Sequence, residues 1–243
     1  ANADTGITAL ASLSFLGAGH THLQGEYAPV LEKSIAFLIG QQKANGDLSG
    51  EAKLFARMYC HSMSLLALSE ALAVTGDQRL LKAVQKPADY SVSAQNKSDG
   101  GWHYQPGDSG DMSQFGWQVL ALHSADLGGA RVPSRTFTQM KSFLKRCSSG
   151  IDGGLASYRP GQRPSATMTA EALLCRYFLH QNVSNSALIE AQRMVTREMP
   201  NRKHVNMYYW YYGTLALYHA GGENWQAWNQ SMKETLLSMQ HVT

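Results

Sequence analysis

Five consecutive aromatic residues, Tyr208 to Tyr212, are the side chains of this sequence best suited to holding a ligand. On a helix they would cover three faces, which is more aromatic surface than one core contact needs. A wall of Tyr and Trp suits an apolar ligand, a carbocation or a sugar ring. Dense ring packing between helices is the alternative interpretation of the same run.

Histidines and carboxylates in two loops could also carry chemistry. His20 and His22 lie in a glycine-bounded loop, where they could bind a metal with a distant carboxylate or only form hydrogen bonds. Asp108 and Asp111 lie in a Gly/Pro loop that precedes a helix beginning near Ser113. Residues in that place commonly make turns and N-caps.

The elements that would position these side chains recur along the chain. Glycines at positions 46, 100 and 153 are 54 and 53 residues apart, and each follows a helical stretch. After each comes an apolar helix, a short glycine loop and an amphipathic helix. Alanines at 11, 67, 121, 172 and 216 align five apolar helices. A period near 50 residues predicts an all-α repeat array of about five helical hairpins.

The two kinds of helix predict two layers. The segment Ile7–Leu16 is apolar nearly all round and is predicted to be buried. The segment from Val30 to Gln42 has Leu31, Ile35, Leu38 and Ile39 on one face, with Pro29 in its first turn. Stacked hairpins would place the apolar helices inside and the amphipathic ones outside, as a solenoid or as a closed ring, the α/α toroid.

The segment Gln95-x3-Asp99-Gly-Gly-Trp102 resembles the Gln–Trp repeat of squalene-hopene cyclases. It is also similar to the Gly-Gly repeat of protein prenyltransferase β subunits. The resemblance extends over nearly the full chain and implies an α6/α6 toroid. Gln240 stands where Gln41 and Gln95 stand, at the close of an outer helix. We therefore expect residues 1–243 to be one incomplete toroid domain, with a sixth hairpin supplied by further chain or by a partner.

The resemblance also implies where catalytic groups would lie. Cyclases of this superfamily protonate their substrate with an Asp-x-Asp-Asp motif, whose first position is matched by Asp111, while Ser113 and Gln114 replace the catalytic pair. Asp111 would then be a replacement acid near His61. Prenyltransferases hold zinc with Asp, Cys and His. Cys60 and His61 are the nearest candidates, but neighbours on a helix point about 100° apart, so no metal is expected.

In a toroid the inner helices run parallel, so their first turns meet at one mouth, where their N–H groups attract anions mildly. We expect an apolar, isoprenoid-like ligand or a peptide to bind there without a cofactor. A cyclase-like or glycan-active enzyme that uses Asp111 and His61 is the alternative. The expected binding residues are Asp4, Thr5, Gln114, Phe115, Trp117, Tyr208, Tyr209, Trp210 and Tyr211.

The amino-acid composition indicates which classes of fold and partner to expect. Charged residues make up 16% of the chain against roughly 25% in typical domains, and apolar residues make up 44%, which favours a large helical core. The net charge is +3 without a Lys/Arg cluster, so no nucleic-acid partner is expected. No apolar run reaches the roughly 18 residues of a membrane span. Three widely spaced cysteines support neither a disulfide framework nor a zinc ribbon, and the compartment stays open.

Overall fold

Helices make up nearly all of the regular structure. The computed structural model describes residues 2–240, which contain ten α-helices, one 3-10 helix and a two-stranded sheet. The prediction of an all-α fold is confirmed. Two compact units, Ala1–Ser142 and Phe143–Thr243, make up the chain. Closure into a toroid and the single-domain organisation stay predictions.

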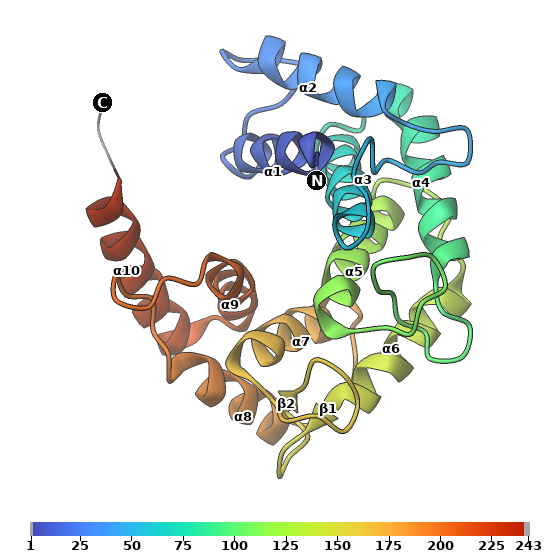
Figure 1. Cartoon of the computed structure of the whole chain (residues 1–243). Coiled ribbons are helices and arrows are strands. Elements are labelled where there is room, and N and C mark those ends of the chain that lie inside the picture. The colour runs from blue at the N-terminus through green and yellow to red at the C-terminus, as the bar shows by residue number, and fades with distance from the viewer. Residues whose placement is uncertain (1, 241–243) are drawn as a thin grey trace. The chain divides into compact units, whose positions relative to one another are not determined.

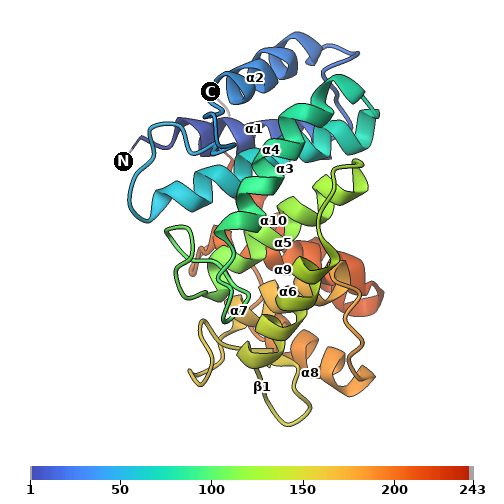
Figure 2. The same cartoon turned by 90° about the vertical axis from the view of Figure 1, so that its right-hand side faces the viewer.

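In the first unit, three inner helices lie side by side, with α3 between α1 and α5 (Figure 1). α2 packs on α1 and α4 packs on α3, as Figure 2 shows from a second side. Nearly all of α3 and α5 is buried, whereas α2 buries only Leu31, Ile35 and Leu38. The elements are α1 (Asp4–Gly17), α2 (Ala28–Gly40), α3 (Ala56–Thr75), η1 (Gln78–Leu80), α4 (Leu81–Ala94), α5 (Met112–Leu127) and α6 (Ser134–Cys147), whose last turn belongs to the second unit.

α3 and α5 begin at the same end of the first unit. Gln114 Nε2 in the first turn of α5 donates to the carbonyl of Met58 at 3.1 Å and to Ser62 Oγ at 3.2 Å, both on α3. The hydroxyls of Tyr59 and Ser113 lie 2.7 Å apart. The parallel arrangement predicted for neighbouring inner helices therefore holds for this pair.

α1 departs from its predicted burial. The exposed fractions of Ile7 and Leu10 are 65% and 41%, while Gly6, Ala9 and Ser12 are buried. A Cβ on Gly6 would lie 3.0 Å from Cys60 Sγ, so small residues let α1 approach α3 closely. The prediction that Ile7–Leu16 is buried on every side is wrong at Ile7 and Leu10, although Leu16 is buried, and the close contact with α3 is made at Gly6.

The repeat glycines bring each loop against the outer helix of the following hairpin. At three such positions a Cβ would lie 2.1 to 2.5 Å from a carbonyl oxygen of that helix, closer than any side chain can approach. The pairs are Gly46 with Lys86 on α4, Gly100 with Gln139 on α6, and Gly154 with Ala187 on α8. In the third repeat the close approach thus belongs to Gly154 and not to the predicted Gly153, at which a Cβ would have no atom within 4 Å. The period in the sequence is thus a period of backbone contacts.

Pro87 lies inside α4 and is buried. Because proline has no N–H, the carbonyl of Ala83 loses its usual helical donor. Gln42 Nε2, just beyond the end of α2, donates to that carbonyl at 2.9 Å. In the next repeat Gln95 Nε2 donates to the carbonyls of Gly100 at 2.9 Å and Thr136 at 3.4 Å. Gln42, the neighbour of the repeat position Gln41, and Gln95 thus both satisfy backbone carbonyls.

The second unit also pairs inner with outer helices, and a small β-hairpin precedes the first of them. α7 packs against α9, with α8 on α7 and α10 on α9 (Figure 1). Buried Arg176 donates from NH1 to the carbonyl of Gly154 at 2.6 Å and from NH2 to that of Gly153 at 3.1 Å, which fixes the hairpin on α7. The elements are β1 (Ser148–Ser149), β2 (Leu155–Ala156), α7 (Ala166–Phe178), α8 (Asn185–Thr196), α9 (Met207–Ala220) and α10 (Gly222–Met239).

Candidate functional site

Asp111 is a fully buried N-cap of α5. Its Oδ1 accepts from the backbone N–H of Gln114 at 2.8 Å and from Ser113 Oγ at 2.8 Å. Capping of this kind satisfies a helical N–H that has no partner within the helix. The N-cap interpretation of Asp111 is therefore confirmed, and burial adds the dry surroundings that an acid–base group would need.

The histidine that meets Asp111 is His103. His103 Nε2 lies 2.8 Å from Asp111 Oδ2, and its Nδ1 lies 3.9 Å from Asp108 Oδ2. Tyr104 stacks on the imidazole with ring centroids 3.7 Å apart. A carboxylate that holds one nitrogen of an imidazole fixes the orientation of the ring, which is how histidines are positioned for proton transfer.

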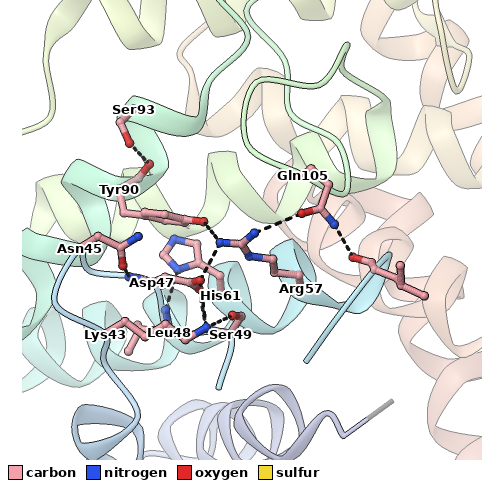
Figure 3. Close-up of polar contacts among 11 residues, drawn as sticks. Lys43, Asn45, Asp47, Leu48, Ser49, Arg57, His61, Tyr90, Ser93 and Gln105 are labelled. Atoms are coloured by element: carbon pink, nitrogen blue, oxygen red, sulfur yellow. Dashed lines mark hydrogen bonds and ion pairs between the residues drawn. The ribbon is translucent and has the colours of Figure 1, made fainter. Parts of the chain in front are cut away.

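His61 has a different role (Figure 3). Its Nδ1 accepts the backbone N–H of Leu48 at 3.1 Å. Its Nε2 lies 2.8 Å from Ser91 Oγ. Since Nδ1 is an acceptor, Nε2 carries the proton of the neutral ring and donates to Ser91. Complete burial lowers the pKa of His61 to about 4. His61 is thus a neutral residue of the core whose two nitrogens are both occupied.

The buried carboxylate of Asp47, beside His61, pairs with two positively charged side chains (Figure 3). Asp47 accepts from the backbone N–H of Ser49 at 2.8 Å, from Lys43 Nζ at 3.2 Å and from Arg57 NH2 at 3.1 Å. Burial would raise the pKa of Asp47, but the hydrogen bonds from Ser49 and the nearby positive charge outweigh it, so the pKa lies below its usual value.

Arg57 extends this network to two further segments. Its guanidinium donates to the hydroxyl of Tyr90 at 3.1 Å and to Gln105 Oε1 at 3.2 Å. Gln105 Nε2 in turn donates to the carbonyl of Leu54 at 3.1 Å. Because Asp47 and Arg57 have several partners each, the network ties the loop before α3 to α4 and to the loop after Trp102. Because these contacts all lie within the protein, we assign Asp47 and Arg57 a structural role.

The other residues expected at the mouth in the first unit are mostly core residues. Gln114, Phe115 and Trp117 are buried on α5, and the ring of Phe115 packs on that of Trp102 at 6.3 Å. Thr5 is buried against Gly50, since a Cβ on that glycine would lie 2.8 Å from Thr5 Cγ2. Asp4 is exposed in the first turn of α1.

The aromatic run of α9 divides between packing and a surface. Tyr208 donates its hydroxyl to Glu171 Oε2 at 2.9 Å, and Tyr209 donates to the carbonyl of Val195. Burial, together with the charge of Glu198, raises the pKa of Tyr209. Trp210 and Tyr211 face recesses on the second unit. Ring packing therefore accounts for part of the run, and ligand binding by Trp210 and Tyr211 stays a prediction.

A polar recess of about 910 Å³ lies beside the loop of residues 197–206, which joins α8 to α9. The carbonyl of Pro200 in this loop accepts from Ser231 Oγ at 2.8 Å and from Thr235 Oγ1 at 3.2 Å, so α10 anchors the loop. Asn206 Oδ1 caps α9 at the backbone N–H of Tyr209, at 3.0 Å. The lining comprises Arg197, Glu198, Met199, Pro200, Asn201, His204, Val205, Asn206, Tyr209, Trp210 and Ser231.

An apolar recess of about 300 Å³ lies between α9 and α10. It shares Trp210 with the polar recess. Trp210, which is 3% exposed, therefore borders one polar and one apolar space. The lining comprises Met207, Trp210, Tyr211, Thr214, Leu215, Met232 and Leu236.

No family model matches this chain, and no curated protein matches it. The resemblance to cyclase and prenyltransferase repeats therefore stays a prediction. The function has to be argued from the side chains described above.

Within residues 2–240, no three His, Cys, Asp or Glu side chains converge as a metal site would require. His22 Nε2 lies 3.0 Å from Asp77 Oδ2, so this loop histidine has a carboxylate partner. Cys60 is a buried free thiol. None of the helices in the described part of the chain is long and apolar enough to cross a bilayer.

Two groups of residues escaped the sequence analysis. His103 follows Trp102, whereas the equivalent positions 54 residues before and after are serines, Ser49 and Ser157. This departure from the repeat could have indicated His103 as a candidate functional residue. The residues of the 197–206 loop carry no comparable signal, because the loop becomes a recess wall only through its anchoring to α10.

Proposed function

We propose that this protein binds an extended peptide segment on its second unit and holds one bulky apolar side chain of that peptide between α9 and α10. The observation that carries the proposal is the shared position of Trp210. A peptide presents apolar side chains and hydrogen-bonding backbone groups in close succession. A polar recess and an apolar recess with one common wall match that alternation.

The linings favour a peptide over an isoprenoid. Sites for apolar small molecules bury most of the ligand against hydrophobic and aromatic side chains. Here the apolar recess is about 300 Å³, whereas the larger space of about 910 Å³ contains Asn201, Asn206 and Ser231. Amides and hydroxyls both donate and accept, as peptide backbones require. Each of the three already forms a hydrogen bond within the protein, and a peptide backbone can use the donors and acceptors that remain.

Trp210 and Met207 have separate parts in this binding. The indole is rigid and nearly buried, so it can contact a ligand with little loss of conformational entropy, as anchor residues at interfaces do. Met207 is 53% exposed at the edge of the apolar recess and can adapt to the entering side chain.

The test begins with peptides selected for binding. Random twelve-residue peptides displayed on phage are panned on the immobilised chain, and the selected peptides are titrated by calorimetry against variants. Met207→Glu should weaken binding about tenfold or more, because it places a charge at the apolar recess. Leu237→Glu is the matched control, since Leu237 is 69% exposed on α10 and lies outside both recesses.

Two results would contradict the proposal. One is a failure to select peptides that bind wild type better than Met207→Glu. The other is native mass spectrometry that finds a co-purifying isoprenoid which Met207→Glu releases and Leu237→Glu retains, because the occupant would then be a lipid.

A second candidate function rests on the 2.8 Å contact of His103 with Asp111. In this account His103 transfers a proton to or from a glycan or an isoprenoid substrate, and Asp111 positions the ring. Isoprenoid diphosphates and a panel of polysaccharides are incubated with the protein and analysed by mass spectrometry. Turnover that is lost in both His103→Gln and Asp111→Asn would support this function. Turnover that survives in His103→Gln, or its absence in wild type, would contradict it.

A further inference from the structure

A third recess, of about 460 Å³, adjoins the polar recess of the second unit. It lies between the β1–β2 hairpin and α8, and Arg197 lines both spaces. Arg197 and Trp210 thus connect three recesses in series along the second unit. The lining of the third comprises Ile151, Asp152, Leu155, Ser186, Ile189, Glu190, Arg193, Met194 and Arg197.

One carboxylate of this third recess is committed to the hairpin. Glu190 accepts the backbone N–H groups of Ile151 at 2.8 Å, Asp152 at 3.2 Å and Gly154 at 2.8 Å. Three N–H donors stabilise its negative charge in place. Glu190 is thereby occupied as a structural anchor of the turn.

The two arginines of the recess are not neutralised in this way. Among residues 2–240, neither Arg193 nor Arg197 forms an ion pair with a carboxylate, and both are exposed. Asp152 is the other acidic residue of the lining. The segment 193–203 contains four Arg or Lys residues and one Glu, a net charge of +3. The lining of the third recess has two arginines and two carboxylates, and one of these carboxylates, Glu190, already accepts three backbone N–H groups, whereas Arg202 and Lys203 line neither recess.

We infer that the bound peptide is acidic and that Arg193 and Arg197 select it by pairing with Asp or Glu side chains next to its apolar anchor. This inference rests on the peptide-binding function proposed above. Guanidinium groups form two-pronged hydrogen bonds with carboxylates, which gives direction as well as charge. The partner is thus an extended polypeptide with a bulky apolar side chain beside a run of acidic residues.

The geometry of α8 supports an extended occupant. Ser186, Ile189, Arg193 and Arg197 follow one another at spacings of three and four, which places them on one face of the helix. At 1.5 Å per residue this row is about 16 Å long, the length of about five extended residues. A short acidic stretch can therefore follow the row from one recess into the next.

The experiment repeats the phage selection on wild type and on the double variant Arg193→Gln/Arg197→Gln. Peptides selected on wild type should be enriched in Asp and Glu beside an aromatic or aliphatic residue. The best of them should bind the double variant about tenfold more weakly, the effect of losing two exposed ion pairs, and the loss should shrink at high salt. Arg163→Gln/Lys145→Gln removes the same charge from exposed positions outside the recess and should leave binding unchanged.

The outcomes separate the two proposals. If wild type selects peptides that lose affinity in Met207→Glu but show no acidic enrichment, the charge inference fails and peptide binding stands. If no peptide distinguishes wild type from Met207→Glu, peptide binding itself fails. If a labelled twelve-residue oligothymidine binds as tightly as the acidic peptides and is lost in the double arginine variant, the arginines recognise phosphate and the inference is overturned.

Discussion

His61 Nδ1 accepts the backbone N–H of Leu48, thirteen residues before it, at 3.1 Å. Thr169 Oγ1 accepts that of Ala156, also thirteen residues before it, at 3.0 Å. The two acceptors are 108 residues apart, as are the two donors, which is twice the 54-residue spacing of Gly46 and Gly100. His61, which its chemical type suggested as a catalytic residue, thus accepts a hydrogen bond that holds the loop before α3 in place.

The pH dependence of stability follows from the burial of His61. An unfolded histidine binds a proton as the pH falls through about 6.5, whereas folded His61 does so only near its pKa of about 4. Unfolding therefore becomes easier as the pH falls from 6.5 to 4, by about 3 kcal/mol from this group. Below pH 4 its contribution stays constant.

The measurement is urea unfolding at pH 7 and pH 4.5 of wild type and His61→Gln. Glutamine can accept from Leu48 and donate to Ser91 but does not titrate, so the difference in unfolding free energy between the two pH values should be smaller in this variant. His204→Gln, at an exposed position, is the control. Equal pH dependence in wild type and His61→Gln would contradict the assignment.

Gln42 is predicted to matter because Pro87 is present. Gln42→Leu removes the amide donor, leaves the carbonyl of Ala83 without a partner and should destabilise the fold by about 1–3 kcal/mol. In a Pro87→Ala background the helix regains its own N–H, so the same change should cost much less. A double-mutant cycle by chemical denaturation measures this coupling, and additive effects would show that Gln42 does not satisfy the gap left by proline.

The close approach of Gly100 to α6 can be separated from its backbone conformation. Gly100 and Gly107 have similar positive φ values, +76° and +81°, but only a Cβ on Gly100 would meet a neighbour, the carbonyl of Gln139 at 2.5 Å. Gly107→Ala should cost about 1–2 kcal/mol from the left-handed conformation alone. Gly100→Ala should cost clearly more, and thermal unfolding compares the two. Equal losses would mean that the loop does not rely on this contact.

Much of the fold could be predicted because its signals are local. The glycine period predicted the hairpins, and the apolar face of α2 predicted its burial through Leu31, Ile35 and Leu38. The burial of α1 could not be predicted in the same way, because Gly6 and Ala9 are buried while Ile7 and Leu10 are exposed. Hydrophobicity indicates what can be buried, whereas the size of neighbouring residues decides which face is.

The candidate site was less predictable than the fold. The aromatic run of α9 drew attention to Trp210, which does line two recesses. The partner of Asp111 was missed, since His103 is brought to it by the loop after Trp102 and not by helical spacing. Arg193 and Arg197 were missed because their surroundings depend on the hairpin that Glu190 holds. Contacts made by loops that are far apart in the sequence produce no periodic pattern from which they could be predicted.

The central claim is that a peptide contacts Trp210, and the indole N–H signals of the five tryptophans in a proton–nitrogen NMR spectrum test it most directly. A selected acidic peptide is titrated into the protein, with the signals of Trp210 and Trp225 assigned from Phe variants. Trp225 packs against Tyr218 outside the recesses. The account predicts a saturable shift of the Trp210 signal with Trp225 unchanged. A bound peptide that leaves the Trp210 signal in place would contradict it.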